Sequence, residues 1–255
     1  MAARQRPPTG WQRREVSGCV YYVVGDSADV AARPTVVLLH EVTGISGDLI
    51  EWAIELARSF RVLVPALLDR EGRPGYLRAA RALCVRREIH VFATGHTSPV
   101  VTRLREMLAV EVPDGVRCGV IGMCLSGGFA LALAVDQRVA AAVVAQPSLP
   151  VHGPRMLPGS AGRAAELGLS PADQSALGRR QNGTLAVRAF RFEEDRISPP
   201  ERLESITELL GPDVARPCTL PGGRHSTLTG AHRSSSAVAD VIAFLGDRLG
   251  PPQHT

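Results

Sequence analysis

Short, almost continuously apolar runs alternate with longer amphipathic stretches along this chain of 255 residues, and this alternation restricts the fold more than any other feature. The apolar runs lie at 20–25, 35–40, 61–68, 117–122, 139–146, 184–190 and 218–220. Runs without a polar face are typical of strands that are buried on both sides of a sheet. Strands in alternation with helices predict an α/β fold with a mostly parallel central sheet and helices on both faces, a three-layer sandwich.

The domain organisation follows from the same pattern. We find no internal repeat, so we expect a single domain over 1–255, with an irregular N-terminal segment at 1–18 and loop or lid regions at 69–98 and 147–180. Ligands of parallel α/β sheets bind beyond the carboxyl ends of the strands. The residues that directly follow each strand are therefore the candidates for chemistry.

Composition and charge exclude several classes of protein. Hydrophobic residues make up 45% and charged residues 21% of the chain, which is typical of a globular protein. No apolar run approaches the roughly 20 residues of a membrane span, and the N-terminus lacks the apolar core of a secretory signal, so we expect a cytoplasmic protein without a membrane partner. The net charge of +4 comes from scattered Arg residues with 4% aromatic residues, which does not favour a nucleic-acid partner.

The five cysteines do not form a metal or disulfide pattern. They are widely spaced and include no CxxC pair, which argues against a disulfide framework and a structural zinc site. We expect no metal and no organic cofactor. A metal site built from Cys124 and His225 is the least favoured alternative.

One cysteine occupies the position of a nucleophile. The run at 117–122 is followed by GMCLSGG at 122–128, in which Cys124 lies between small residues on a strand–turn–helix connection, as in a nucleophile elbow. The helix N-terminus lowers the pKa of a thiol placed there, and the backbone N–H of Leu125 offers one oxyanion donor. Ser126 is the competing nucleophile, two residues farther into the helix.

Acidic and basic partners follow later strands in the order nucleophile, acid, base. Asp195 follows the run at 184–190, and Glu194 is the alternative acid. His225 lies in the Gly-rich segment after 218–220, where it can accept the thiol proton and later activate water.

The segment after 35–40 completes the candidate site. The backbone N–H of Val42 is the expected second oxyanion donor. A carboxylate at Glu41, next to the thiol, would keep the thiol protonated until substrate binding displaces it.

At these residues the sequence resembles the dienelactone hydrolases. The shared segments are LLHEVTGI, GMCLSGGFALALA, RFEEDRISPPER and GGRHS, in the order of the family and over about 20–249. The resemblance implies an α/β-hydrolase fold, a pairing of Glu41 with the resting thiol, an oxyanion hole at Val42 and Leu125, and a triad of Cys124, Asp195 and His225.

The resemblance also implies a reaction. The founding activity of the family opens a lactone ring of a dienelactone whose carboxylate is held by Arg side chains. The stretch at 84–105 departs from the founding pattern, and Arg86 and Arg87 are either an anion contact or a solvated surface pair. We therefore expect a monomeric or homodimeric hydrolase of a small ester or lactone that can carry a carboxylate. The alternative is a catalytically silent small-molecule-binding or regulatory protein on the same fold.

Overall fold

The computed structural model describes residues 8–25, 33–67, 95–151, 160–180 and 183–250. Within these ranges eight strands form one sheet in the order β1-β2-β4-β3-β5-β6-β7-β8. Their bounds are β1 Trp11–Val16, β2 Cys19–Val24, β3 Thr35–Leu39, β4 Arg61–Pro65, β5 Cys118–Met123, β6 Val139–Ala145, β7 Ala186–Phe192 and β8 Ala215–Leu220.

The register brings the carboxyl ends of the central strands together. All neighbours from β4 to β8 are parallel, whereas β1 and β2 are antiparallel to their neighbours. Leu39 at the end of β3 pairs with Gly122 of β5, and Gly122 pairs with Val144 of β6. The segments that leave these strands therefore start from one edge of the sheet.

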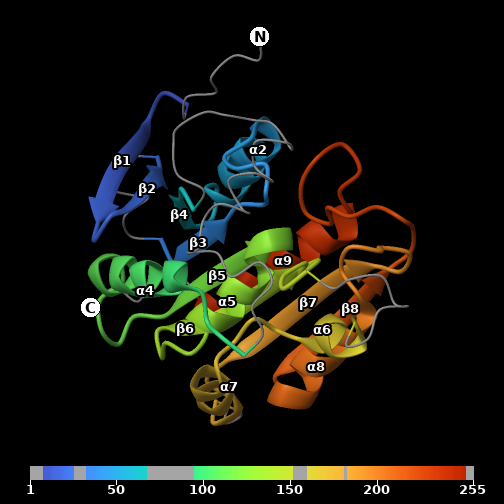
Figure 1. The fold of residues 1–255 in the computed structure, drawn as a ribbon. Helices are drawn as coiled ribbons and strands as arrows, with labels where there is room; N and C mark the ends of the chain where they lie inside the picture. Colours follow the sequence, from blue (N-terminus) through green and yellow to red (C-terminus); the bar gives the residue numbers. More distant parts are fainter. Residues whose placement is uncertain (1–7, 26–32, 68–94, 152–159, 181–182, 251–255) are drawn as a thin grey trace.

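Helices cover both faces of the sheet and confirm the predicted three-layer α/β-hydrolase architecture (Figure 1). Apolar side chains of α2 (Gly47–Leu56) and α9 (Ser235–Leu249) belong to the core on one face. Those of α4 (Pro99–Glu111), α5 (Gly127–Leu133) and α8 (Pro200–Leu210) belong to the core on the other face. The sheet is thus buried on both sides, as its continuous apolar runs require.

The N-terminal segment differs from its prediction. We expected 1–18 to be irregular, but β1 spans Trp11–Val16 and pairs with β2 as a hairpin, while residues 1–7 lie outside the described ranges. Ser17 and Gly18 both have positive φ, the requirement of a type I′ hairpin turn. The strand lies at the edge of the sheet, and the polar side chains in its middle are exposed. Its sequence therefore contains no apolar run from which a strand could be predicted.

The predicted lid regions are described in part. The region at 147–180 contains two short helices, α6 (Ser160–Ala165) and α7 (Pro171–Gly178), besides loop. Most of 69–98 lies outside the described ranges.

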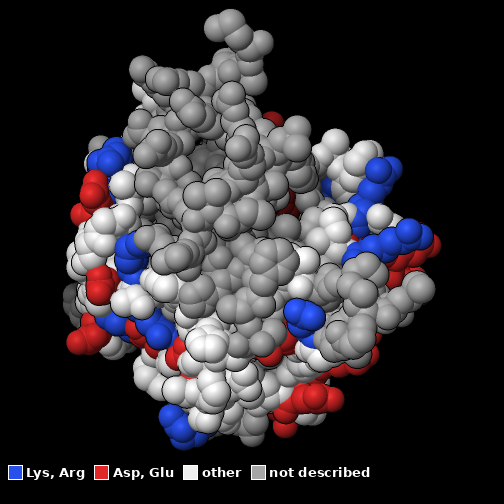
Figure 2. All heavy atoms as spheres, in the orientation of Figure 1, with Lys and Arg blue, Asp and Glu red and all other residues white. Residues whose placement is uncertain are grey.

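The described residues on the face drawn in Figure 2 carry both signs of charge. In Figure 2, acidic and basic side chains are interspersed around the rim of this face and form no patch of one sign. Each helix among the described residues is too short or too polar to cross a membrane.

Candidate active site

The connection from β5 to α5 forms a strained, tightly packed elbow at Cys124. Cys124 has a φ of +54°, a left-handed conformation that is costly for a residue with a side chain. It begins a short 3₁₀ turn, η1 (Cys124–Ser126), which leads directly into α5. A Cβ atom at Gly122 would lie 2.3 Å from the carbonyl oxygen of Ser126, so the close approach of strand and helix requires glycine at this position.

The two candidate nucleophiles have different surroundings. The Ser126 hydroxyl is fully buried, accepts a hydrogen bond from the backbone N–H of Met123 (2.9 Å) and contacts the carbonyl oxygens of Met123 (3.0 Å) and Leu39 (3.3 Å). It therefore stabilises the elbow from inside. The sulfur of Cys124 instead lies 3.3 Å from the hydroxyl of Ser148 on the next loop. This geometry favours Cys124 over Ser126.

His225 and Asp195 meet as the predicted base and acid. The Nδ1 atom of His225 lies 2.8 Å from the Oδ2 atom of Asp195, whose side chain is 2% exposed. The other carboxylate oxygen of Asp195 accepts the N–H groups of Ile197 (2.8 Å) and Ser198 (3.3 Å). The carboxylate is thus held in one orientation, and His225 Nδ1 carries the proton that it donates to Asp195.

The opposite ring nitrogen of His225 is free to transfer a proton. Nε2 is buried and has no hydrogen-bond partner within the described part of the chain. Burial lowers the pKa of His225, but the interactions of the ring with Asp195 and Cys124 outweigh it and raise the pKa to about 10. The interactions that raise this pKa include those with the sulfur of Cys124, which therefore lies close to the imidazole.

A buried arginine organises the segment that carries the acid. Arg191, near the end of β7, donates hydrogen bonds to the carbonyl oxygens of Asp195 (3.0 Å), Ser198 (2.9 Å) and Glu193 (3.1 Å). Glu194, the alternative acid, is exposed, and its carboxylate lies against Gly223. The structure thus brings Asp195, and not Glu194, to the imidazole.

His40 fixes the peptide unit that carries one predicted oxyanion donor. Its Nε2 accepts the N–H of Leu67 (3.0 Å), so its Nδ1 carries the proton and donates to the carbonyl oxygen of Glu41 (2.6 Å). The N–H of Gly44 donates to the same carbonyl oxygen (3.0 Å). Because a peptide unit is planar, these two bonds also fix the direction of the Val42 N–H. Burial lowers the pKa of His40 to about 4, which keeps the ring neutral.

The second predicted donor belongs to η1. The N–H of Leu125 lies in the first turn of this helix, where backbone donors have no acceptor within the helix. The convergence of the Val42 and Leu125 N–H groups on a substrate oxygen stays a prediction.

The structure does not pair Glu41 with the thiol, contrary to the expectation from the resemblance. One carboxylate oxygen of Glu41 accepts the side-chain amide of Gln146 (2.8 Å), and the other accepts the hydroxyl of Ser226 (3.2 Å), while Cys124 contacts Ser148. Amide and hydroxyl groups donate stronger hydrogen bonds to a carboxylate than a thiol does. The hydrogen bonds of Glu41 in this structure therefore go to these two groups and not to the thiol.

Comparison with known proteins assigns the family. The model of the dienelactone hydrolase family matches residues 21–208, which is more than half of the chain. The chain belongs to the dienelactone hydrolase family. No curated protein matches it significantly.

Solved structures similar to this dienelactone hydrolase family member share its fold. A candidate dienelactone hydrolase from Klebsiella pneumoniae subsp. pneumoniae MGH 78578 is 16% identical, with a TM-score of 0.63 over 94% of this chain and 97% of the other. A dienelactone hydrolase-like promiscuous phosphotriesterase from metagenomic libraries is 18% identical, with a TM-score of 0.61 over 91% and 93%. The esterase RhEst1 from Rhodococcus sp. ECU1013 is 13% identical, with a TM-score of 0.59 over 94% and 100%.

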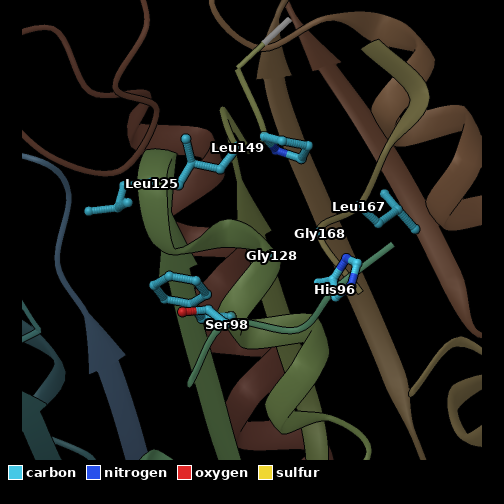
Figure 3. A pocket seen from close by; sticks show the side chains of 9 residues that line it. His96, Ser98, Leu125, Gly128, Leu149, Leu167 and Gly168 are labelled. Atoms are coloured by element: carbon cyan, nitrogen blue, oxygen red, sulfur yellow. The ribbon is translucent and has the colours of Figure 1, made fainter. Parts of the chain in front are cut away.

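An apolar hollow borders the elbow of this family member. It is lined by nine residues and is partly open to solvent. Both predicted lid regions contribute to its lining: 69–98 through His96 and Ser98, and 147–180 through four residues, two of which are Leu149 and Leu167 (Figure 3). Leu125, which follows the predicted nucleophile, lies on the same hollow. The hollow therefore lies beside the elbow and offers mainly apolar contacts, although Cys124 itself does not line it.

Two other predictions concern ions. Arg86 and Arg87 lie outside the described residues, so their contact with a substrate anion stays a prediction. Within the described ranges, no three His, Cys, Asp or Glu side chains gather in a way that could hold a metal ion.

Sequence reasoning missed three side chains of the site. Gln146 and Ser148 follow β6, and Ser226 follows His225. The rule that functional residues follow strands points to the segment after β6, but uncharged Gln and Ser side chains there carry no signal of their own.

Proposed function

We propose that this member of the dienelactone hydrolase family hydrolyses a small ester or lactone through a triad of Cys124, His225 and Asp195. The observation that carries the proposal is the state of His225. Its Nδ1 lies 2.8 Å from Asp195, while its Nε2, for which the described residues offer no hydrogen-bond partner, belongs to a ring that lies close to Cys124. A base oriented on one side and free on the other is the arrangement that activates a nucleophile.

The reaction follows from these positions. His225, whose raised pKa favours the imidazolium, holds the proton taken from the thiol, and the thiolate of Cys124 attacks the carbonyl carbon of the ester. The N–H groups of Val42 and Leu125 stabilise the negative oxygen of the tetrahedral intermediate. The carbon–oxygen bond then breaks, the imidazolium gives its proton to the leaving alkoxide, and a thioester remains. Water, deprotonated by His225, attacks the thioester, which releases the acid and restores the thiol.

The lining of the hollow supports a small, uncharged group next to the reacting carbonyl. Phe129, Leu149 and Leu167 offer apolar contacts to an acyl or alkoxy group that lies against them. A carboxylate elsewhere on the substrate is compatible with the proposal through Arg86 and Arg87.

Hydrolysis of nitrophenyl acetate tests the proposal. Cys124→Ala should abolish turnover because no other described group of the site replaces the sulfur. Cys19→Ala, which removes a buried thiol of β2, should retain turnover and serves as the matched control.

Two results would contradict the proposal in different ways. Full activity of Cys124→Ala together with loss in Ser126→Ala would assign the nucleophile to Ser126. Absence of hydrolysis by the wild-type protein over a panel of esters and lactones would favour the catalytically silent binding protein.

A further inference from the structure

A closed ring of hydrogen bonds joins the loop of the predicted base to the loop of a predicted oxyanion donor. Gln146 donates from Nε2 to Glu41 Oε1 (2.8 Å), and its Oε1 accepts the backbone N–H (3.2 Å) and hydroxyl (2.5 Å) of Thr227. The hydroxyl of Ser226 donates to Glu41 Oε2 (3.2 Å) and closes the ring. Ser226 and Thr227 directly follow His225, and Glu41 directly precedes Val42.

Gln146 is built into the centre of this ring. It is fully buried, its φ of +35° is unusual for a residue with a side chain, and its N–H donates to the carbonyl oxygen of Phe190 on β7 (2.6 Å). Strained backbone persists only where the surrounding contacts enforce it, and such residues concentrate at functional sites. Gln146 thereby connects the ends of β6 and β7 with both loops.

We infer that Glu41 and Gln146 are a positioning pair, which holds the His225 loop and the Val42 loop in a fixed relation for the proposed hydrolysis. The inference rests on that proposed function. In this arrangement Glu41 acts as the acceptor of two hydrogen bonds and does not control the protonation of the Cys124 thiol. Neither residue of the pair needs to contact the substrate.

Exchanging the two side chains moves the negative charge from position 41 to position 146 and keeps the ring of hydrogen bonds. With Gln at 41 and Glu at 146, the amide of residue 41 donates to a carboxylate oxygen of residue 146. The other carboxylate oxygen accepts both groups of Thr227, and the amide oxygen of residue 41 accepts the hydroxyl of Ser226. The double variant Glu41→Gln/Gln146→Glu thus keeps every bond of the ring and displaces only the negative charge.

The experiment compares this exchange with the single changes, using kcat for nitrophenyl acetate. Gln146→Glu places two carboxylates face to face and should lower kcat roughly 100-fold, the scale of loss expected from a misplaced catalytic group. Glu41→Ala opens the ring and should cause a similar loss. The double variant should recover kcat to within roughly 10-fold of wild type. KM should change little in all variants because none of the substitutions alters the apolar hollow.

The opposite pattern would overturn the inference. If the charge of Glu41 acts on the thiol, Glu41→Gln and the double variant will be as impaired as Gln146→Glu, and no rescue will occur. If Gln146→Glu fails to fold, as measured by thermal unfolding, the comparison of Glu41→Ala with Glu41→Gln makes the same distinction, because only the alanine variant loses both acceptors.

Controls separate this inference from the proposed function. Glu51→Gln and Gln137→Glu repeat the same chemical changes at exposed positions and should leave kcat unchanged. Hydrolysis by the wild-type protein that depends on Cys124 establishes the function independently. Failure of rescue in that active protein overturns only the positioning pair.

Discussion

Asp195 determines both the orientation and the charge of His225. Its carboxylate binds Nδ1 at 2.8 Å and favours the protonated ring, which is one reason that the pKa of His225 is raised to about 10. Asp195→Asn should therefore lower this pKa toward its ordinary value and, by disturbing the tautomer, reduce kcat by roughly 10³- to 10⁴-fold. Titration of the imidazole by NMR and steady-state hydrolysis of nitrophenyl acetate measure the two effects.

The exposed neighbour Glu194 supplies the control. Glu194→Gln should change neither the pKa of His225 nor kcat by much, and the reverse outcome would assign the acid to Glu194.

The raised pKa of His225 also determines how the free energy of unfolding depends on pH. The Asp195–His225 interaction contributes fully below the ordinary His pKa of 6.5 and is lost as the pH rises through about 10. The destabilisation caused by Asp195→Asn should shrink over the same range.

The amino-acid sequence predicted the candidate catalytic side chains better than it predicted the side chains that position them. The order Cys124, Asp195, His225 follows from strand ends and reactive side chains, and the structure brings Asp195 and His225 together. The structure pairs Glu41 with Gln146 and Ser226 and not with the thiol. Nothing in the local sequence shows that these donors, 105 and 185 residues from Glu41, reach the same place.

At the scale of elements, the crossing of β5 and α5 leaves no room beside Gly122. Gly122→Ala should destabilise the protein by about 3 kcal/mol, the upper range of overpacking, because backbone atoms of Ser126 block the new methyl group. Chemical denaturation measures the change. Gly246→Ala in α9 is the matched control. Its Cβ would meet nothing within 4 Å, so helix propensity should make it more stable by about 1 kcal/mol. Equal effects of both changes would contradict the argument.

Element prediction worked for the buried strands and was weaker at the edges of the sheet. The runs at 35–40, 117–122 and 139–146 are strands because both faces of the central sheet are covered. At one edge, β8 starts at Ala215 and not at the predicted 218, and it includes Pro217. An edge strand tolerates proline because one side of its backbone has no partner. At the other edge, the polar strand β1 lacks the apolar pattern that prediction requires.

At the scale of the whole molecule, hydrogen bonds to Glu111 connect the N-terminal hairpin with the parallel part of the sheet. Its side chain, at the end of α4 and 5% exposed, accepts hydrogen bonds from Arg14 of β1, Tyr21 of β2 and Arg61 of β4. Burial raises the pKa of Glu111, but these donors outweigh it, so the pKa lies below its ordinary value of 4.5.

Glu111→Gln should destabilise the protein by about 2–3 kcal/mol at pH 7, since it weakens charge-assisted hydrogen bonds at a buried site. A carboxyl group with a lowered pKa contributes stability above its unfolded pKa and loses it as the pH falls through the folded value. The difference from wild type should therefore vanish near the acid end of a urea-unfolding series. Glu106→Gln, at an exposed position of the same helix, should show little change at any pH.

His40 is neutral in the folded protein, and its protonation at low pH should limit the activity of the site. A second proton on this ring would face the N–H of Leu67, so protonation breaks the hydrogen bond that holds the ring whose Nδ1 orients the Val42 peptide. Because the folded pKa is about 4 and the unfolded value 6.5, stability falls progressively as the pH drops between these values. We expect hydrolysis to fade reversibly as the pH falls through about 4, where the folded protein takes up this proton, and His40→Gln, which has no such proton to gain, to lose this part of the pH–activity profile. An unchanged profile in that variant would place the origin of acid inactivation elsewhere.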